Sequence, residues 1–347
     1  MLSDSCAGGG SDAMTHAAIL TRRDCLQVLL GGTLVVGATS TNAQVPFAGV
    51  VDETWMDVGR KRDVPVRVRW PQADPNNDRS AVVLFSHGLG GTRDGGTVWG
   101  QAWTAAGFVV VHIQHPGSDL AAVSRLATSF SDKVGLRAAA GAEQLLARLQ
   151  DVGFVLNQIG LRHAARQGRW ASARPDAVGM SGHSFGAHTT LGMAGRRYPI
   201  FEGISEPRLA SFIAFSPTGP SVGDAQQAFD RLSRPMLTIT GTRDQDVVGN
   251  GATADKRIAV FAALPPGGKA QLVLQDADHM TFAGQTGRAA EIVPRESVTR
   301  DQQARDHALM AAITADWWRA TLLDDTAARA RLIEPVGLGP GDLWQQK

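Results

Sequence analysis

Cysteine is almost absent from this chain of 347 residues, and its two cysteines, Cys6 and Cys25, both lie near the start. The rest of the chain therefore has no disulfide and no thiol nucleophile, and it shows no Cys/His spacing typical of a zinc site. An excess of charge of one sign is also lacking, since 34 Lys and Arg stand against 33 Asp and Glu, a formal net charge of +1. This balance, without clusters of basic and aromatic residues, argues against a nucleic-acid partner.

The chain also lacks an apolar run long enough to span a bilayer, which needs roughly 20 residues. Its first apolar run, VLLGGTLVVGA at 28–38, follows an arginine pair at 22–23 and precedes TSTNAQ. This layout resembles a twin-arginine export signal, although two neighbouring positions depart from the usual pattern. We therefore expect residues 1–43 to be removed on export to the periplasm or the medium. A buried N-terminal helix is the alternative, and translation starts at Met1 or Met14.

From residue 44 to residue 347, β-rich apolar runs alternate with segments of helical pattern. The expected strands lie at 64–70, 81–86, 107–114, 176–181, 212–216, 236–241 and 270–275. The expected helices lie at 97–107, 141–160, 184–195, 224–233, 254–264 and 306–323. Continuous apolar runs are typical of parallel strands buried on both faces. The pattern predicts a single doubly wound, mostly parallel α/β domain with helices on both faces, no integral membrane segment, and a candidate cap at 115–140.

A G-x-S-x-G motif, GHSFG at 182–186, lies between an expected strand and an expected helix. This is the context of a nucleophile elbow, in which a sharp turn holds a serine in a strained backbone conformation. Gly182 and Gly186 remove side chains that would collide across that turn, and the helix start places N–H groups near the serine. Ser184 is therefore the candidate nucleophile.

A second G-x-S-x-G, GPSVG at 219–223, shows that the motif alone is a weak indication. Pro217 and Pro220 separate it from the preceding strand and restrict the local backbone, which favours a plain loop. We therefore prefer Ser184 to Ser221 as the nucleophile.

A serine becomes a nucleophile only beside a base that a third group orients. Two further polar residues, Asp244 and His279, each lie just past the end of an expected strand. Open α/β sheets place their sites at the carboxyl ends of strands, where Ser184 also lies. His279 is therefore the candidate base and Asp244 the candidate acid, with Asp246 as the alternative acid.

Negative charge that develops on a reacting oxygen needs N–H donors. The Phe185 N–H directly follows the serine, and the Leu89 N–H belongs to the loop SHGLGG at 86–91. That loop lacks the Gly-Lys-Ser/Thr of a phosphate-binding loop, so we expect these two N–H groups to form an oxyanion hole. The candidate pocket residues are His87, Gly88, Trp99, Trp103, His115 and His183. No metal ion or organic cofactor is expected.

Four segments together resemble the serine α/β hydrolases, most closely the platelet-activating-factor acetylhydrolase-like and predicted dienelactone hydrolase group. They are SHGLGG at 86–91, GFVVVHIQHPGSD at 107–119, GHSFGA at 182–187 and DADHMTF at 276–282. The resemblance covers about residues 50–320. It implies the α/β-hydrolase fold, ester hydrolysis through an acyl-enzyme on Ser184, and an oxyanion hole at Leu89 and Phe185.

The chain departs from that group at two points. In the animal platelet-activating-factor enzymes the acid follows the strand after the nucleophile helix, where this chain has Ser216, so Asp244 is left as the acid. Dienelactone hydrolases use a cysteine nucleophile, which the mature chain lacks. The resemblance thus implies a small-molecule or lipid-like ester without naming it. A serine peptidase or amidase and a non-catalytic binding protein on the same fold are the alternatives, and no oligomeric state is indicated.

Overall fold

The computed structural model describes residues 49–72, 79–127, 132–199, 201–291 and 293–347. The export signal expected at 1–43 lies outside these residues. The main strands are β1 (Gly49–Asp57), β2 (Arg62–Trp70), β3 (Ser80–Ser86), β4 (Val109–Ile113), β5 (Ala173–His183), β8 (Leu209–Phe215), β9 (Met236–Arg243), β10 (Lys269–Asp278) and β11 (Leu343–Gln346). Within the described residues they form one nine-stranded sheet in the order β1-β2-β4-β3-β5-β8-β9-β10-β11. The strands from β4 to β10 in this order pair in parallel, whereas β1, β2 and β11 run antiparallel to their neighbours.

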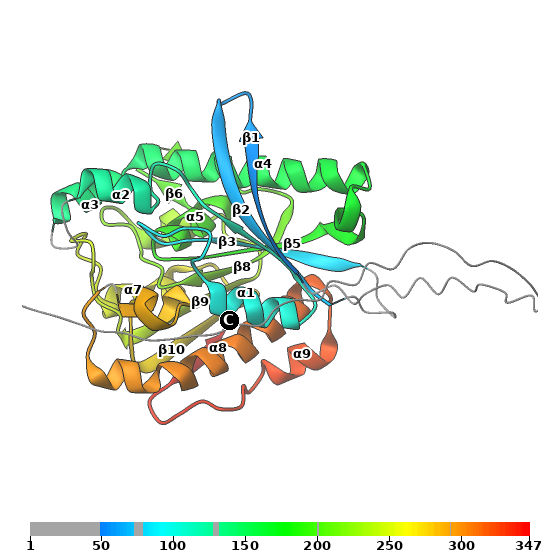
Figure 1. Cartoon of the computed structure of the whole chain (residues 1–347). Helices are drawn as coiled ribbons and strands as arrows, with labels where there is room; N and C mark the ends of the chain where they lie inside the picture. The colour runs from blue at the N-terminus through cyan, green and yellow to red at the C-terminus, as the bar shows by residue number, and fades with distance from the viewer. Residues whose placement is uncertain (1–48, 73–78, 128–131, 200, 292) are drawn as a thin grey trace, which may run out of the picture. The chain divides into compact units, whose positions relative to one another are not determined.

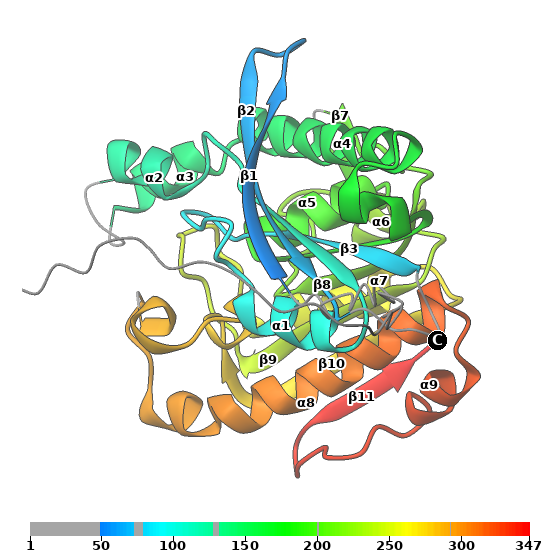
Figure 2. The ribbon, with the colours of Figure 1, turned by 45° about the vertical axis from the view of Figure 1, so that its right-hand side comes forward.

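Helices cover both faces of the sheet (Figures 1 and 2). They are α1 (Thr97–Ala105), α2 (Leu120–Leu126), α3 (Lys133–Ala139), α4 (Ala142–Ala164), α5 (Phe185–Met193), α6 (Ala225–Phe229), α7 (Ala254–Ala263), α8 (Ser297–Leu322) and α9 (Thr326–Arg331). Short 3-10 turns lie at Gly168–Ser172, Thr281–Ala283 and Gly287–Glu291, and a small hairpin joins β6 (Arg197–Tyr198) to β7 (Phe201–Glu202).

Two apolar clusters hold the helix layers against the sheet. Successive side chains of a strand point to opposite faces, so Leu84 enters the cluster under α4, α5 and α7, whereas Phe85 enters the one under α1 and α8. Both side chains are almost fully buried. The expected α/β architecture with a mostly parallel sheet and helices on both faces is therefore confirmed.

Several elements were not expected from the sequence. Strand β1 is an edge strand with mostly exposed side chains, and β11 is an edge strand of four residues, LWQQ, none of them fully buried, so neither carries a clear apolar pattern. Residues 115–140 contain α2 and α3 where only an irregular cap was expected. Each of these two helices is seven residues long, which is too short for a helical periodicity to be recognised.

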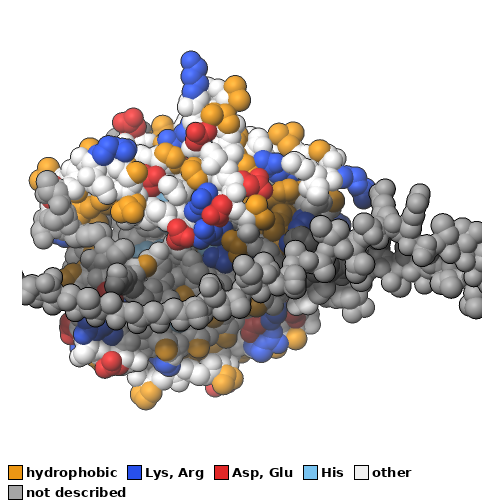
Figure 3. Space-filling view, viewed as in Figure 1, with side chains coloured by type: hydrophobic (Ala, Val, Ile, Leu, Met, Phe, Trp, Pro, Cys, Tyr) orange, Lys and Arg blue, Asp and Glu red, His pale blue; other side chains and the backbone are white. Residues whose placement is uncertain are grey.

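The surface agrees with the balanced composition of the chain. On the face shown in Figure 3, acidic and basic side chains are interspersed rather than gathered into patches of one sign. None of the helices in the described ranges is both long and apolar enough to cross a bilayer.

Trp103 on α1 offers a test of this packing. Its side chain is fully buried, its indole nitrogen donates to Thr314 Oγ1 at 2.8 Å, and its ring meets Trp318 edge-on. We expect Trp103→Ala to lower the free energy of unfolding by about 3–5 kcal/mol, because it leaves a cavity between α1, α8 and the sheet. Urea unfolding measures this, with Trp103→Phe as the milder control; equal losses in the two variants would contradict a cavity effect.

Candidate functional site

Ser184 occupies a strained turn between β5 and α5. Its backbone has φ 54° and ψ −112°, a region that residues with side chains rarely adopt. A Cβ on Gly182 would lie 2.3 Å from the Gly186 carbonyl oxygen, and a Cβ on Gly186 would lie 1.9 Å from the Ser86 carbonyl oxygen. The Ser184 N–H donates to the Phe215 carbonyl at 3.0 Å and ties the turn to β8. The glycines of the motif are thus required by close backbone approach.

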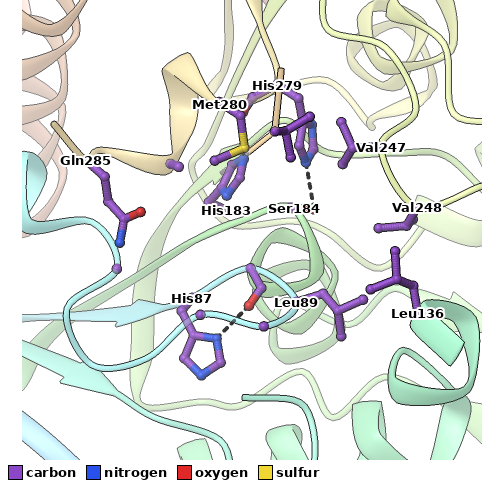
Figure 4. A pocket seen from close by; sticks show the side chains of 16 residues that line it. His87, Leu89, Leu136, His183, Ser184, Val247, Val248, His279, Met280 and Gln285 are labelled. Carbon is purple, nitrogen blue, oxygen red and sulfur yellow. Dashed lines mark hydrogen bonds between the residues drawn. The ribbon is translucent and has the colours of Figure 1, made fainter. Parts of the chain in front are cut away.

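Ser184, His279 and Asp244 form a continuous hydrogen-bonded chain. The distance from Ser184 Oγ to His279 Nε2 is 2.9 Å (Figure 4). The distance from His279 Nδ1 to Asp244 Oδ1 is 2.8 Å. Asp244 follows the last residue of β9 and His279 the last residue of β10, and both strands run parallel to β5 and its neighbours. The three side chains meet because the carboxyl ends of parallel strands share one edge of the sheet.

The Asp244 carboxylate is fully buried and fully hydrogen-bonded. Its Oδ2 accepts from Thr240 Oγ1 at 2.8 Å, and its Oδ1 accepts from Ser216 Oγ at 2.9 Å. Burial by itself would raise the pKa of Asp244, but the nearby Arg257, followed by His279 and Ser216, outweighs burial and holds this pKa below its usual range. Asp244 is therefore an anion at neutral pH.

The two alternative residues lie outside this hydrogen-bonded chain. Asp246 Oδ1 accepts the N–H groups of Val248 and Gly249 at 2.8 and 2.7 Å, and its Oδ2 accepts that of Gly251 at 2.6 Å. Its carboxylate therefore shapes the loop after β9 instead of facing His279. Ser221 is exposed on the loop before α6 and does not line the pocket that contains Ser184.

The loop after β3 lies directly against Ser184. A Cβ on Gly88 would lie 3.1 Å from His183 Nδ1 and 3.5 Å from the Ser184 Cβ, so this backbone approaches the serine closely. Neither the Leu89 N–H nor the Phe185 N–H donates a hydrogen bond within the described residues. The Phe185 N–H directly follows Ser184 and lies at the positive end of the α5 dipole, and Leu89 belongs to the loop that contacts the serine.

Arg148 on α4 fixes this loop from below, a role that sequence reasoning missed. Its guanidinium is fully buried, donates twice to the His87 carbonyl at 2.9 Å, and lies 4.4 Å above the Phe185 ring. Burial lowers the pKa of Arg148 to about 9, opposed by Asp151 and Asp119, so the side chain stays charged at neutral pH. Arg148 thus contacts both the loop that carries the Leu89 N–H and the helix start that carries the Phe185 N–H. A lone arginine in a helical pattern gives no signal of such a role.

His87 lines the pocket, but its ring nitrogens are already engaged. Nε2 accepts the backbone N–H of His115 at 3.0 Å, which places the proton of the neutral ring on Nδ1, 2.6 Å from the Gly88 carbonyl. Burial, and then the neighbouring Arg148, lowers the pKa of His87 well below its usual value, so the ring is neutral.

His115 belongs to a second hydrogen-bonded Ser–His–Asp set. Ser86 Oγ lies 2.9 Å from His115 Nε2, and His115 Nδ1 lies 3.0 Å from Asp151 Oδ2. All three side chains are fully buried, and burial lowers the pKa of His115 to about 4. No substrate can reach this serine, so the set is structural. The expectation that His115 borders the pocket is wrong, because its ring is fully buried behind the loop after β3 and is not among the lining residues.

The pocket at Ser184 has mostly apolar walls and no charged side chain among its lining residues. They are His87, Gly88, Leu89, Gly90, Gly91, Gly95, Leu136, His183, Ser184, Val247, Val248, His279, Met280, Ala283, Gln285 and Val293. Figure 4 shows Leu89, Leu136, Val247 and Val248 on one side of Ser184, with Met280 and Gln285 on the other. The expected pocket residues Gly88 and His183 belong to this lining.

Trp99 and Trp103, also expected at the pocket, are instead fully buried core residues. Trp99 stacks on Phe215 at 5.1 Å and donates to the Phe282 carbonyl at 3.2 Å. Their spacing of one helical turn reflects the face of α1 that packs on the sheet.

The candidate cap contributes one pocket wall. Leu136 on α3 packs with Leu89, and two basic side chains of α3 hold the opposite loop. Lys133 Nζ donates to the Val247 carbonyl at 2.6 Å, and Arg137 donates to the Gly249 carbonyl at 2.8 Å. The helix and the loop after β9 therefore form one continuous side of the pocket.

Comparisons with protein-family models and with curated proteins find no relative of this chain. No protein-family model matches the chain, and no curated protein matches it. Across the described residues, no group of three or more His, Cys, Asp or Glu side chains is arranged to hold a metal ion. The functional interpretation therefore rests on the geometry around Ser184.

Gly186→Ala tests whether the turn needs a glycine. The added methyl would collide with the Ser86 carbonyl, so we expect a loss of about 1–3 kcal/mol in the free energy of unfolding. Gly153→Ala is the matched control, because it lies within α4 with open space at its Cβ and should stabilise the protein by about 0.5–1 kcal/mol. Urea unfolding measures both, and a neutral Gly186→Ala would contradict the close approach.

Proposed function

We propose that this protein is a serine carboxylic-ester hydrolase of the α/β-hydrolase fold, resembling the platelet-activating-factor acetylhydrolase-like group. The observation that carries the proposal is the hydrogen-bonded chain from Ser184 through His279 to the buried Asp244, which opens into an apolar pocket. The other Ser–His–Asp set of this protein lacks such access, so accessibility as well as geometry favours Ser184.

In the proposed reaction, neutral His279 takes the Ser184 proton on Nε2 while Ser184 Oγ attacks the ester carbonyl. Asp244 accepts the Nδ1–H bond, orients the ring and stabilises the imidazolium that forms. The Leu89 and Phe185 N–H groups stabilise the oxyanion of the tetrahedral intermediate. His279 then protonates the leaving alcohol, and water, activated in the same way, releases the acid from the acyl-enzyme. All steps use groups of this chain and water.

The lining supports an uncharged, small-molecule or lipid-like ester as the substrate. A charged group would lose its hydration among Leu89, Leu136, Val247 and Val248 without gaining a counter-charge. Export of the protein stays a prediction, because the residues that suggest it lie outside the described part of the chain.

Labelling with a fluorophosphonate, located by peptide mass spectrometry, tests the nucleophile. We expect the label on Ser184, and we expect Ser184→Ala to abolish labelling and to lower p-nitrophenyl butyrate hydrolysis on the order of 10⁶-fold. Ser221→Ala is the matched control and should keep both. A label on Ser221, or activity that survives Ser184→Ala, would overturn the assignment; no label and no hydrolysis in the wild type would favour a binding protein.

The acid of the proposed triad is tested by two isosteric changes. Asp244→Asn removes the anion that orients His279, so kcat should fall about 10⁴-fold. Asp246→Asn should change kcat far less, because that carboxylate binds only loop N–H groups among the described residues. Steady-state hydrolysis separates the two, and the reverse order of effects would exchange their roles.

A further inference from the structure

Asp244 carries a full charge at a place from which water is excluded. Its side chain has no exposed surface, and it must stay ionised to orient His279 in the proposed triad. A buried carboxylate is costly unless hydrogen bonds and a counter-charge compensate for its lost hydration. His279 is neutral when it accepts the Ser184 proton, so the counter-charge must come from another residue.

Arg257 on α7 supplies that charge. It is 4% exposed, and its Nε lies 3.0 Å from Asp244 Oδ1. The same Nε–H donates to the Asp244 backbone carbonyl at 3.0 Å, and an Nη1–H donates to the Ser216 carbonyl at 2.8 Å. One guanidinium therefore contacts the turn after β8 and the turn after β9 together.

Ser216 completes the arrangement from the end of β8. Its hydroxyl lies 2.9 Å from Asp244 Oδ1 and 2.8 Å from His279 Nδ1, so it touches both partners of the hydrogen bond that orients the imidazole. Its backbone has φ 56°, an uncommon value for a residue with a side chain. A strained residue held in this way indicates that the surrounding contacts determine its position.

We propose that Arg257 and Ser216 are positioning residues of the site: Arg257 holds the buried Asp244 as an anion, and Ser216 fixes its carboxylate on His279 Nδ1. This inference rests on the proposed function, because it concerns the acid of the proposed triad. Neither residue reaches the pocket, so each acts through Asp244.

The direction of the pH effect follows from the groups that face Asp244. The titratable or charged ones are Arg257 from α7, His279 after β10 and His183 at the end of β5; Thr240 and Ser216 are neutral donors. Without Arg257, burial would raise the pKa of Asp244 with less opposition. Asp244 would then take up a proton at a higher pH, and the acidic limb of the kcat/KM profile would move toward neutrality.

The experiment compares pH profiles of p-nitrophenyl butyrate hydrolysis for the full-length protein and its variants. We expect Arg257→Met to move the acidic limb upward by about 1–3 pH units. Arg257→Lys keeps the positive charge but loses the planar guanidinium with its several N–H donors. It should therefore move the acidic limb less than Arg257→Met does and still lower kcat. Ser216→Ala should lower kcat at least tenfold with little change in KM, which is the size expected for a hydrogen bond to a charged group, about 1.5–3 kcal/mol.

Arg196→Met is the matched control, because Arg196 is another buried arginine that binds the Thr218 carbonyl and contacts His188 instead of Asp244. Arg196→Met should lower the thermal stability of the protein without moving the acidic limb of its kcat/KM profile. Both positioning residues act through Asp244, so we expect Arg257→Met and Ser216→Ala to cost little further activity in an Asp244→Asn background.

Several outcomes would overturn the inference. They are an unchanged acidic limb in Arg257→Met, the same shift in Arg196→Met, or full additivity of Ser216→Ala with Asp244→Asn. If Arg257→Met does not fold, Arg257→Lys and Ser216→Ala carry the test. An unlabelled and inactive wild type would instead refute the proposed function, so the two failures are distinguishable.

Discussion

Gly186 passes the Ser86 carbonyl so closely that a methyl group there would lie 1.9 Å from the oxygen. This approach brings the start of α5 against the end of β3, and with it the two segments that carry the Phe185 and Leu89 N–H groups. It also forces the turn at Ser184 into a backbone conformation with φ 54°. The strain is sustained because β5 holds His183 in the sheet beside β8 and the Ser184 N–H donates to the Phe215 carbonyl, so local relaxation would break paired backbone groups.

On each side of that turn a buried carboxylate faces an arginine. Arg257 faces Asp244 on one side, while Asp151, which binds Arg62 and His115, lies below the loop on the other. Removing one partner of such a pair leaves an uncompensated charge in a region without water, which costs far more than a surface ion pair is worth. The polar groups around Ser184 are therefore each held by a buried partner, as the proposed hydrolase mechanism requires.

The two Ser–His–Asp sets show why hydrogen-bond geometry is not enough to assign a role. Ser86, His115 and Asp151 are connected at distances close to those of Ser184, His279 and Asp244. The first set is sealed beneath the loop, whereas Ser184 opens into a pocket. Access by a substrate is the property that separates them, and it depends on α2, α3 and the loop after β9 as much as on the serine itself.

The alternation of strands and helices could be predicted without the structure, because continuous apolar runs and helical periodicity are local patterns that burial on two faces imposes. The sequence also pointed to Ser184, Asp244 and His279, since each lies just past the end of a strand and parallel strands end at one edge. The edge strands β1 and β11 were missed because little of their surface is buried. The helices α2 and α3 were missed because seven residues are too few to show a helical periodicity.

The places of several similar residues in the site or the core, by contrast, became clear only from the packing of distant elements. The tertiary structure separated Asp244 from Asp246, placed Trp99 and Trp103 in the core and His115 beneath the loop, and brought Arg257, Ser216 and Arg148 to the site. These assignments depend on contacts between residues 13 to 211 positions apart in the chain, such as Arg257 with Asp244 and Trp103 with Thr314. A local pattern records which side chains are apolar, but the partner of a buried polar group is set by the packing of distant elements.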